Sequence, residues 1–426
     1  MIAKKSSVIN QEVLILFLFL LSLLNAPTLF FITIIGFLLA IHYSKKDGLI
    51  IYLMFIQLRS LINPGIAVSY GSTTLQLLKW IVIFSTSILI LIKNKKCASE
   101  VGKIIFSLIF FSVNIILYAF LKSSFPVVAS FKVISYVIPF VAIIKGINQS
   151  NDSEKLFKNI VKLLGIMIFA GIICIKSSIG YYVNGYAFQG IFNHPNLFGV
   201  MISIFIASFL YSNKKLDCKA LMIIITSIWL IMMSKSRTSL ISSSLTFIIF
   251  IISQNIKFSK KFLSIFAILL LLLSYCAINN SIIDTLNDFL YKGHDNSILY
   301  SRKSQFEANI NRFKSSPLIG TGFNVPYNRN NISYSLSMDL VVENGNIILS
   351  LLGDIGLIGL LLFVLVYTKI FLIGKKNIKT IFFIPFLVSM GEMSFFSTNN
   401  FAIILYILFG MYIADGIKNK TNKLNL

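Results

Sequence analysis

The feature that most constrains this chain is its division into apolar runs, each about as long as a bilayer is thick. A helix needs about 20 mostly apolar residues to cross the hydrocarbon core. Because no water there can satisfy backbone amides, each long apolar run is expected to be a helix. The sequence predicts an all-α polytopic membrane protein with about 12–14 transmembrane helices in a single membrane domain, residues 1–426. The predicted spans are 11–26, 27–43, 48–63, 75–92, 103–121, 127–144, 159–176, 196–212, 220–234, 237–254, 262–279, 346–371, 380–396 and 400–416.

The charged residues argue against a soluble or nucleic-acid-binding protein. They make up 12% of the chain, whereas soluble domains carry about a quarter. The net charge of +23 is divided among short clusters between apolar runs, not gathered on one basic face. We therefore expect membrane lipids, and no nucleic acid, as partners.

The lysine clusters predict the orientation of the chain. Each follows an even-numbered span, and lysines of short connectors favour the cytoplasmic side. This alternation predicts two cytoplasmic termini and puts segments 64–74, 177–195 and 279–345 outside. Lys4 and Lys5 resemble the start of a signal peptide, but no small-residue cleavage site follows, so a retained first helix is expected. The clusters are Lys45/Lys46, Lys93/Lys95/Lys96, Lys214/Lys215/Lys219, Lys257/Lys260/Lys261, Lys375/Lys376/Lys379 and Lys418/Lys420/Lys423.

Segment 279–345 is the one long polar stretch of the chain. Loops of this length are usually functional or disordered. Apolar residues recur with rough helical spacing over Leu299–Phe313. The sequence therefore predicts a large extracytoplasmic loop that is partly helical and forms an ordered cap on the membrane surface.

The four cysteines indicate neither a disulfide framework nor a zinc site. Cys97, Cys174, Cys218 and Cys276 lie far apart and form no CxxC pair. No metal and no cofactor are expected.

Two polar segments interrupt the apolar pattern in the middle of the chain. In Gln189–Gly199, Asn193 or Asn196 could cap the following helix. A helix N-terminus favours an anion, although an ordinary capped loop is equally compatible. In Ser234–Ser239, snorkelling to the interface explains Lys235, whereas the serines and threonine around Arg237 indicate a polar cleft.

Two further segments lie in and after the long polar loop. Arg302 and Arg312 carry fork-shaped donors suited to phosphate, with a solvated surface as the simple alternative. Arg237 and Arg302 together could clamp a lipid-linked diphosphate. In the last segment Asp354 lies inside an apolar helix and should face protein. Glu343 stands at the mouth of that helix, where it could accept a proton or only cap the helix.

One carboxylate remains outside these segments. Glu392 lies within the apolar run 380–396, where a buried cation could pair with it. The sequence names no partner for it.

Taken in order, the four segments resemble the O-antigen ligase/polymerase family, which includes the Wzy polymerases. The resemblance implies a membrane glycosyltransferase of the outer leaflet, which moves a glycan from undecaprenyl diphosphate to an acceptor sugar without a metal. The two family arginines fall on Arg237 and Arg302. The matching stretches are GIFNHPNLFG at 190–199, SKSRTSL at 234–240, SRKSQFEANINRFKSSPLIGTGFN at 301–324 and ENGNIILSLLGDIGLIGL at 343–360.

One departure from the family pattern separates polymerase from ligase. Ligases carry a His-Asn pair that falls here on Gly345-Asn346, so the histidine is missing. This favours a polymerase and leaves Glu343 as the nearest base, with His194 as a second candidate.

The sequence therefore predicts a polymerase of O-antigen, capsule or exopolysaccharide. Its expected catalytic residues are Glu343, Arg237 and Arg302. Substrate contacts are expected from His194, Asn196, Arg312 and Asn346. The expected partners are the undecaprenyl-diphosphate-linked oligosaccharide, a chain-length regulator and a flippase. The alternatives are a ligase, or a lipid-linked-sugar flippase or other transporter, which should show broken helices near the midplane.

Overall fold

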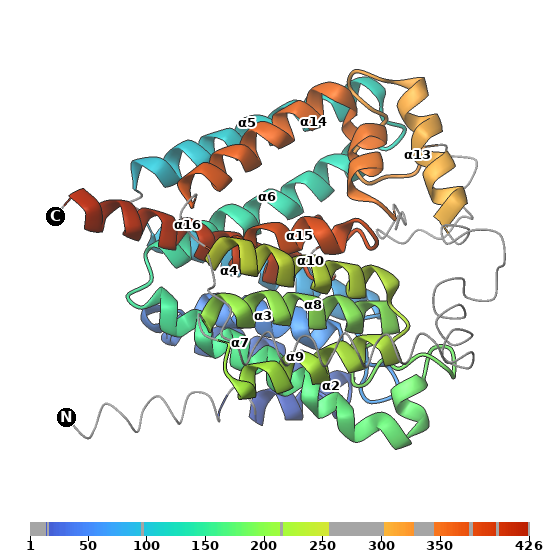
Figure 1. Cartoon of the computed structure of the whole chain (residues 1–426). Helices are drawn as coiled ribbons and strands as arrows, with labels where there is room; N and C mark the ends of the chain where they lie inside the picture. Colours follow the sequence, from blue (N-terminus) through green and yellow to red (C-terminus); the bar gives the residue numbers. More distant parts are fainter. Residues whose placement is uncertain are drawn as a thin grey trace.

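The computed structural model describes residues 14, 17–94, 98–213, 216–254, 302–327, 345–374, 378–397 and 400–424. These residues form a bundle of helices, and among them the only β-type pairing is an isolated bridge between Ile62 and Phe192. The predicted all-α fold is confirmed (Figure 1).

Every predicted span within the described ranges overlaps a helix, although span 380–396 does so only in its first part. Span 262–279 and most of 11–26 lie outside the described residues. The helices are α2 (Ala26–His42), α3 (Gly48–Ser60), α4 (Thr73–Lys93), α5 (Ser99–Lys122), α6 (Pro126–Asn148), α7 (Ser153–Ala170), α8 (Pro195–Ser212), α9 (Cys218–Met233), α10 (Arg237–Gln254), α13 (Lys303–Ser315), α14 (Ile347–Ile373), α15 (Thr380–Ser389) and α16 (Ala402–Leu424).

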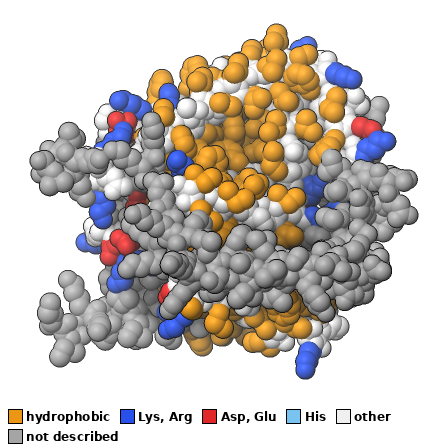
Figure 2. All heavy atoms as spheres, in the orientation of Figure 1, with side chains coloured by type: hydrophobic (Ala, Val, Ile, Leu, Met, Phe, Trp, Pro, Cys, Tyr) orange, Lys and Arg blue, Asp and Glu red, His pale blue; other side chains and the backbone are white. Residues whose placement is uncertain are grey.

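Length and composition suit these helices to a membrane. Eight of the described helices are long and apolar enough to span one: α4, α5, α6, α8, α10, α14, α16 and α7 with the short helix that continues it to Lys176. Helices α2, α3, α9 and α15 are apolar but shorter. In the face shown in Figure 2, hydrophobic side chains cover the middle and charged ones gather toward the left and right edges. This is the surface of a multi-pass membrane protein.

The core of the bundle is formed by α6, α8 and α16, the most buried of the long helices. Helix α6 packs between α4, α5 and α16, and α8 packs against α10 and α15. Helix α14 lies along α5 and holds α13 against its first half. The bundle thus gives α8, α10 and α14 a common direction.

Three of the lysine-rich connectors meet at one end of the bundle, in the part of the chain that the structure describes. Lys93 Nζ at the end of α4 donates to Ser44 Oγ over 2.6 Å, and Lys420 lies 3.8 Å from Glu100. At the opposite end, Asn63 N donates to Ile191 O over 2.9 Å, which joins segments 61–63 and 191–193. The connectors that the charge pattern assigns to opposite sides of the membrane therefore lie at opposite ends.

The prediction of one helix over 380–396 is wrong at its second half. Helix α15 ends at Ser389, and Met390–Ser397 continue as irregular chain. Gly391 in this irregular segment packs closely against α10, since an added Cβ would overlap the Thr238 side chain. The second half of the run is also the less apolar one, because it contains Gly391, Glu392 and Ser394.

Candidate functional site

The irregular segment Met390–Glu392 is the meeting point of the four polar segments. Glu392 Oε1 accepts hydrogen bonds from Asn196 Nδ2 at 3.0 Å and from Arg302 Nη2 at 3.1 Å. Asn346 Nδ2 lies 3.5 Å from Met390 O, and Gly391 packs closely against the Thr238 side chain. Residues from the starts of α8, α10, α13 and α14 are thereby gathered around one carboxylate.

In the first polar segment, Gln189–Gly199, a histidine caps the helix α8. His194, not Asn193 or Asn196, is the N-cap of α8, and its Nδ1 accepts a hydrogen bond from Asn196 N at 3.2 Å. Asn193 N is engaged elsewhere, donating to Leu61 O over 2.8 Å. The Asn196 side chain is consequently directed to Glu392 instead of its own helix.

Helix α8 lies directly against the start of α10. A Cβ on Gly199 would come within 2.6 Å of the Ser236 Cβ. Ser236 Oγ and Ser239 Oγ share a hydrogen bond of 2.7 Å. This contact fixes the position of Arg237, the first residue of α10, relative to the α8 N-terminus.

Lys235 and Arg237 have different surroundings. Lys235 has a positive φ of 52° and its Nζ lies 4.9 Å from the ring centroid of Tyr186, a favourable cation–π contact. The Arg237 guanidinium is partly buried, and Thr238 beside it contacts Gly391, the neighbour of the Glu392 that pairs with Arg302. The two arginines of the proposed clamp therefore come from segments that meet at Met390–Glu392.

Arg302 is held on one edge and partly exposed on the other. Its Nη1 donates to Gly345 O over 2.8 Å, and its Nη2 forms the ion pair with Glu392. The side chains of Arg302 and Glu392 are 21% and 32% exposed. A pair at this depth is reachable from the end of the bundle.

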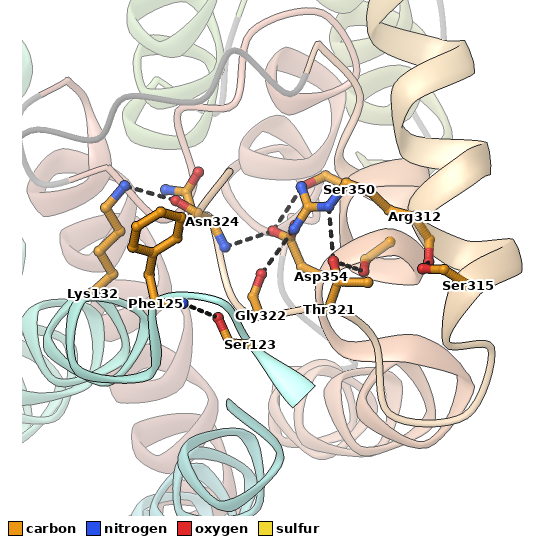
Figure 3. Close-up of polar contacts among 11 residues, drawn as sticks. Ser123, Phe125, Lys132, Arg312, Ser315, Thr321, Gly322, Asn324, Ser350 and Asp354 are labelled. Atoms are coloured by element: carbon orange, nitrogen blue, oxygen red, sulfur yellow. Dashed lines mark hydrogen bonds and ion pairs between the residues drawn. The ribbon is translucent and has the colours of Figure 1, made fainter. Parts of the chain in front are cut away.

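Arg312, one of the expected substrate contacts, is enclosed in the protein. Its Nη2 lies 2.5 Å from Asp354 Oδ1 and donates to Gly322 O over 2.9 Å. Its Nε donates to Thr321 Oγ1 over 2.9 Å (Figure 3). The two charged side chains are only 5% and 3% exposed. This geometry favours a structural role, and the Asp354 side chain faces protein as the sequence predicts.

The loop after α13 is fastened to a break in α14. Gly356 has φ 66° and ψ −170°, which interrupts the helix and frees backbone groups. Pro317 O and Leu318 O accept hydrogen bonds from Leu357 N and Ile358 N at 2.9 and 3.1 Å. The loop thus satisfies groups that hydrocarbon would leave unpaired. We call residues 317–322 with Arg312 and Asp354 the clasp.

A lysine of α6 extends the clasp into the bundle. Lys132 Nζ donates to Asn324 O over 2.7 Å, and Asn324 N donates to Asp354 Oδ2 over 2.9 Å (Figure 3). Asp354 therefore links α13, α14 and α6 through one carboxylate.

The start of α14 contains Gly345, the position at which ligases carry a histidine. Asn346 is the N-cap, and its Oδ1 accepts from Ile348 N and Leu349 N at 3.0 and 3.2 Å. Gly345 has φ 35°, and a Cβ there would overlap the Gln305 side chain. The position therefore disfavours any side chain. Glu343, the expected base, lies outside the described residues.

The residue that sequence reasoning left without a role is Glu392. A lone carboxylate in an apolar run marked Glu392 as unusual in the sequence. Its partners Arg302 and Asn196 come from distant parts of the chain, so the sequence could not name them. In the described part of the chain, no group of three or more His, Cys, Asp and Glu side chains could hold a metal ion.

Part of the chain is similar to a known protein family. Residues 221–364 match the model of a protein family described as O-antigen ligase. No curated protein matches the chain. The matched range contains Arg237, Arg302, Arg312 and Asp354, and ends before Glu392. The match confirms, over residues 221–364 of this multi-pass membrane protein, the predicted resemblance to that family.

Proposed function

We propose that this protein is a polysaccharide polymerase, which transfers an undecaprenyl-diphosphate-linked glycan onto an acceptor repeat unit at the outer face of the bacterial cytoplasmic membrane. The observation that carries the proposal is the meeting of two arginine-bearing segments at Met390–Glu392: Arg302 pairs with Glu392, and Thr238, next to Arg237, contacts Gly391. Both arginines lie inside the family match, and a diphosphate has the charge and shape that guanidinium groups bind.

The proposed chemistry is a single displacement. An acceptor hydroxyl, oriented or deprotonated by Glu343, attacks the anomeric carbon of the donor glycan. The bond from that carbon to the diphosphate oxygen breaks, and its electron pair leaves with undecaprenyl diphosphate. Arg237 and Arg302 neutralise this leaving group, where fixed positive charge lowers the barrier most. The displacement inverts the anomeric configuration.

Ligation of the glycan to a lipid acceptor is the second candidate, and the description of the matched family favours it. The conformation and crowding of Gly345 count against it, because the ligase histidine would fall there. His194 is the nearest described imidazole to the site, but its Nδ1 serves as the α8 cap.

The test is the surface polysaccharide of a strain that lacks this gene, complemented with wild type, Arg237→Ala, Arg302→Ala or Glu343→Gln. Each variant must reach the membrane in normal amounts. We expect the deletion to lose the long-chain ladder and retain single repeat units, with none of the three variants restoring it.

Other outcomes identify the alternatives. Complete long chains that are not attached to their lipid acceptor indicate a ligase. Repeat units that accumulate inside the cell indicate a flippase. An unchanged ladder excludes the proposed polymerase for that polysaccharide.

A further inference from the structure

Glu392 is the one carboxylate that touches the proposed clamp, among the residues that the structure describes. It lies outside the family match and carries no role in the mechanism above. It follows the short helix α15, in the irregular segment that contacts the starts of α10 and α14. Its position is therefore tied to the same helix ends that carry the arginines.

The hydrogen bonds to Glu392 use one of its oxygens. Both Asn196 Nδ2 and Arg302 Nη2 donate to Oε1. Asn196 is itself fixed, because its backbone N–H donates to the cap residue His194. The carboxylate is thus a bridge between the N-terminus of α8 and the Arg302 guanidinium.

Arg302 keeps donors for a ligand, as far as the described residues show. A guanidinium has five N–H donors. Gly345 O takes one from Nη1, and Glu392 takes one from Nη2. The two supports fix the plane of the guanidinium, and the described part of the chain offers no partner to the other three N–H groups.

We propose that Glu392 is a positioning residue, which holds Arg302 in the orientation that binds the diphosphate of the lipid-linked donor. The inference rests on the proposed function, because it takes the donor diphosphate as the ligand of Arg302. A guanidinium fixed in advance loses less rotational freedom when it binds, so a well-held Arg302 binds more tightly.

The competing effect is electrostatic repulsion between the Glu392 carboxylate and the diphosphate. Glu392 is 32% exposed, so solvent screens its charge. The direct hydrogen bond to Arg302 at 3.1 Å is lost completely when the side chain is shortened. Loss of the support therefore outweighs relief of the negative charge.

The experiment measures binding of undecaprenyl diphosphate, without a glycan, to the purified full-length protein in lipid nanodiscs. We expect Glu392→Ala to bind about tenfold more weakly than wild type, the size of a lost hydrogen bond to a charged group. Glu392→Gln should lose less, because its amide oxygen can still accept from Arg302. The matched control is Glu307→Gln on α13, whose side chain is 61% exposed and pairs with Lys303 at 4.0 Å.

A double-mutant cycle separates positioning from other roles. Once Arg302 is replaced by alanine, the further change Glu392→Ala should weaken binding no more, since nothing remains to be positioned. A merely structural role would weaken both backgrounds equally and lower the thermal stability of Glu392→Ala. Either of those results overturns the proposal.

The remaining outcomes are also distinct. If wild type binds the lipid and Glu392→Ala binds equally or more tightly, the positioning role is wrong and the proposed function stands. If wild type does not bind the lipid, the proposed donor is wrong and this inference falls with it.

Discussion

Helix α13 carries two arginines with opposite surroundings, Arg302 where it begins and Arg312 near its end. Each pairs with a carboxylate from later in the chain. The Arg312–Asp354 pair is 5% and 3% exposed, whereas the Arg302–Glu392 pair is 21% and 32% exposed. Arg312 is bound on Nε and Nη2 by the protein itself, while Arg302 has only two anchors in the described residues.

This difference teaches how one residue type serves two purposes in one motif. A buried ion pair that loses one partner leaves an uncompensated charge, so Arg312 and Asp354 depend on each other for folding. An accessible pair contributes little to the fold, and an arginine in it can keep its partner while its other donors meet a ligand. In this chain, the two arginines of α13 are thus suited to different roles.

The largest effect on stability is expected from Asp354→Ala. It leaves Arg312 charged and buried, which costs about 3–5 kcal/mol of unfolding free energy. Thermal unfolding of the purified protein and its amount in the membrane measure the loss. Glu307→Ala, on the same helix surface, serves as control. An unchanged melting temperature would show that the clasp does not hold the fold.

Arg302→Ala should instead remove activity and leave the protein folded. Loss of one charge-stabilising group lowers turnover by about 10²–10³-fold. The measurement is glycan chain elongation at equal protein amounts, and Arg237→Ala should behave alike. If Arg302→Ala lowers the amount of protein in the membrane as strongly as Asp354→Ala does, Arg302 holds the fold as Arg312 does, and the contrast between the two arginines is wrong.

A smaller loss of stability is expected from Gly356→Ala, at the break in α14 to which the clasp is fastened. Its φ of 66° is strained for alanine, and the Cβ would overlap the Leu318 backbone. The cost is about 1–3 kcal/mol, again measured by thermal unfolding. Gly102→Ala in α5 is the matched control, because nothing lies within 4 Å of its added Cβ. Equal melting temperatures for the two variants would contradict a tight clasp.

The smallest effect is expected from Lys303→Gln, next to Arg302. Lys303 and Glu307 pair at 4.0 Å with side chains 71% and 61% exposed. Such pairs contribute at most about 0.5 kcal/mol. Stability and elongation should both stay near wild type. A strong loss of elongation would extend the ligand-facing surface of α13 beyond Arg302.

The sequence predicted the helices well because hydropathy acts locally. Membrane crossing imposes both length and apolarity, so 75–92 corresponds to α4 and 127–144 to α6 with small changes at their ends. The helix in the long loop was also foreseen, since apolar spacing over Leu299–Phe313 matches α13. The break at Ser389 was not, although Gly391, Glu392 and Ser394 make the second half of that run less apolar.

The candidate site was predictable only in part. A cation among polar residues in an apolar chain points to a site, which is how Arg237 and Arg302 were found. Whether an arginine faces ligand or protein depends on its partner, and no local pattern shows that Arg312 meets Asp354. The partners of Glu392 are set by tertiary packing alone.

The glycines at the helix contacts have a consequence for how such a protein can change its substrate. Gly199, Gly345 and Gly391 bring chain segments together where an added methyl group would crowd or overlap a neighbour. These positions cannot vary one at a time, so the spacing of the arginines is inherited as a unit. Under the proposed function, new sugar specificity is expected to arise from exposed side chains near the site, such as Tyr186 beside Lys235. Libraries that seek altered glycans should therefore diversify that rim and keep the three glycines fixed.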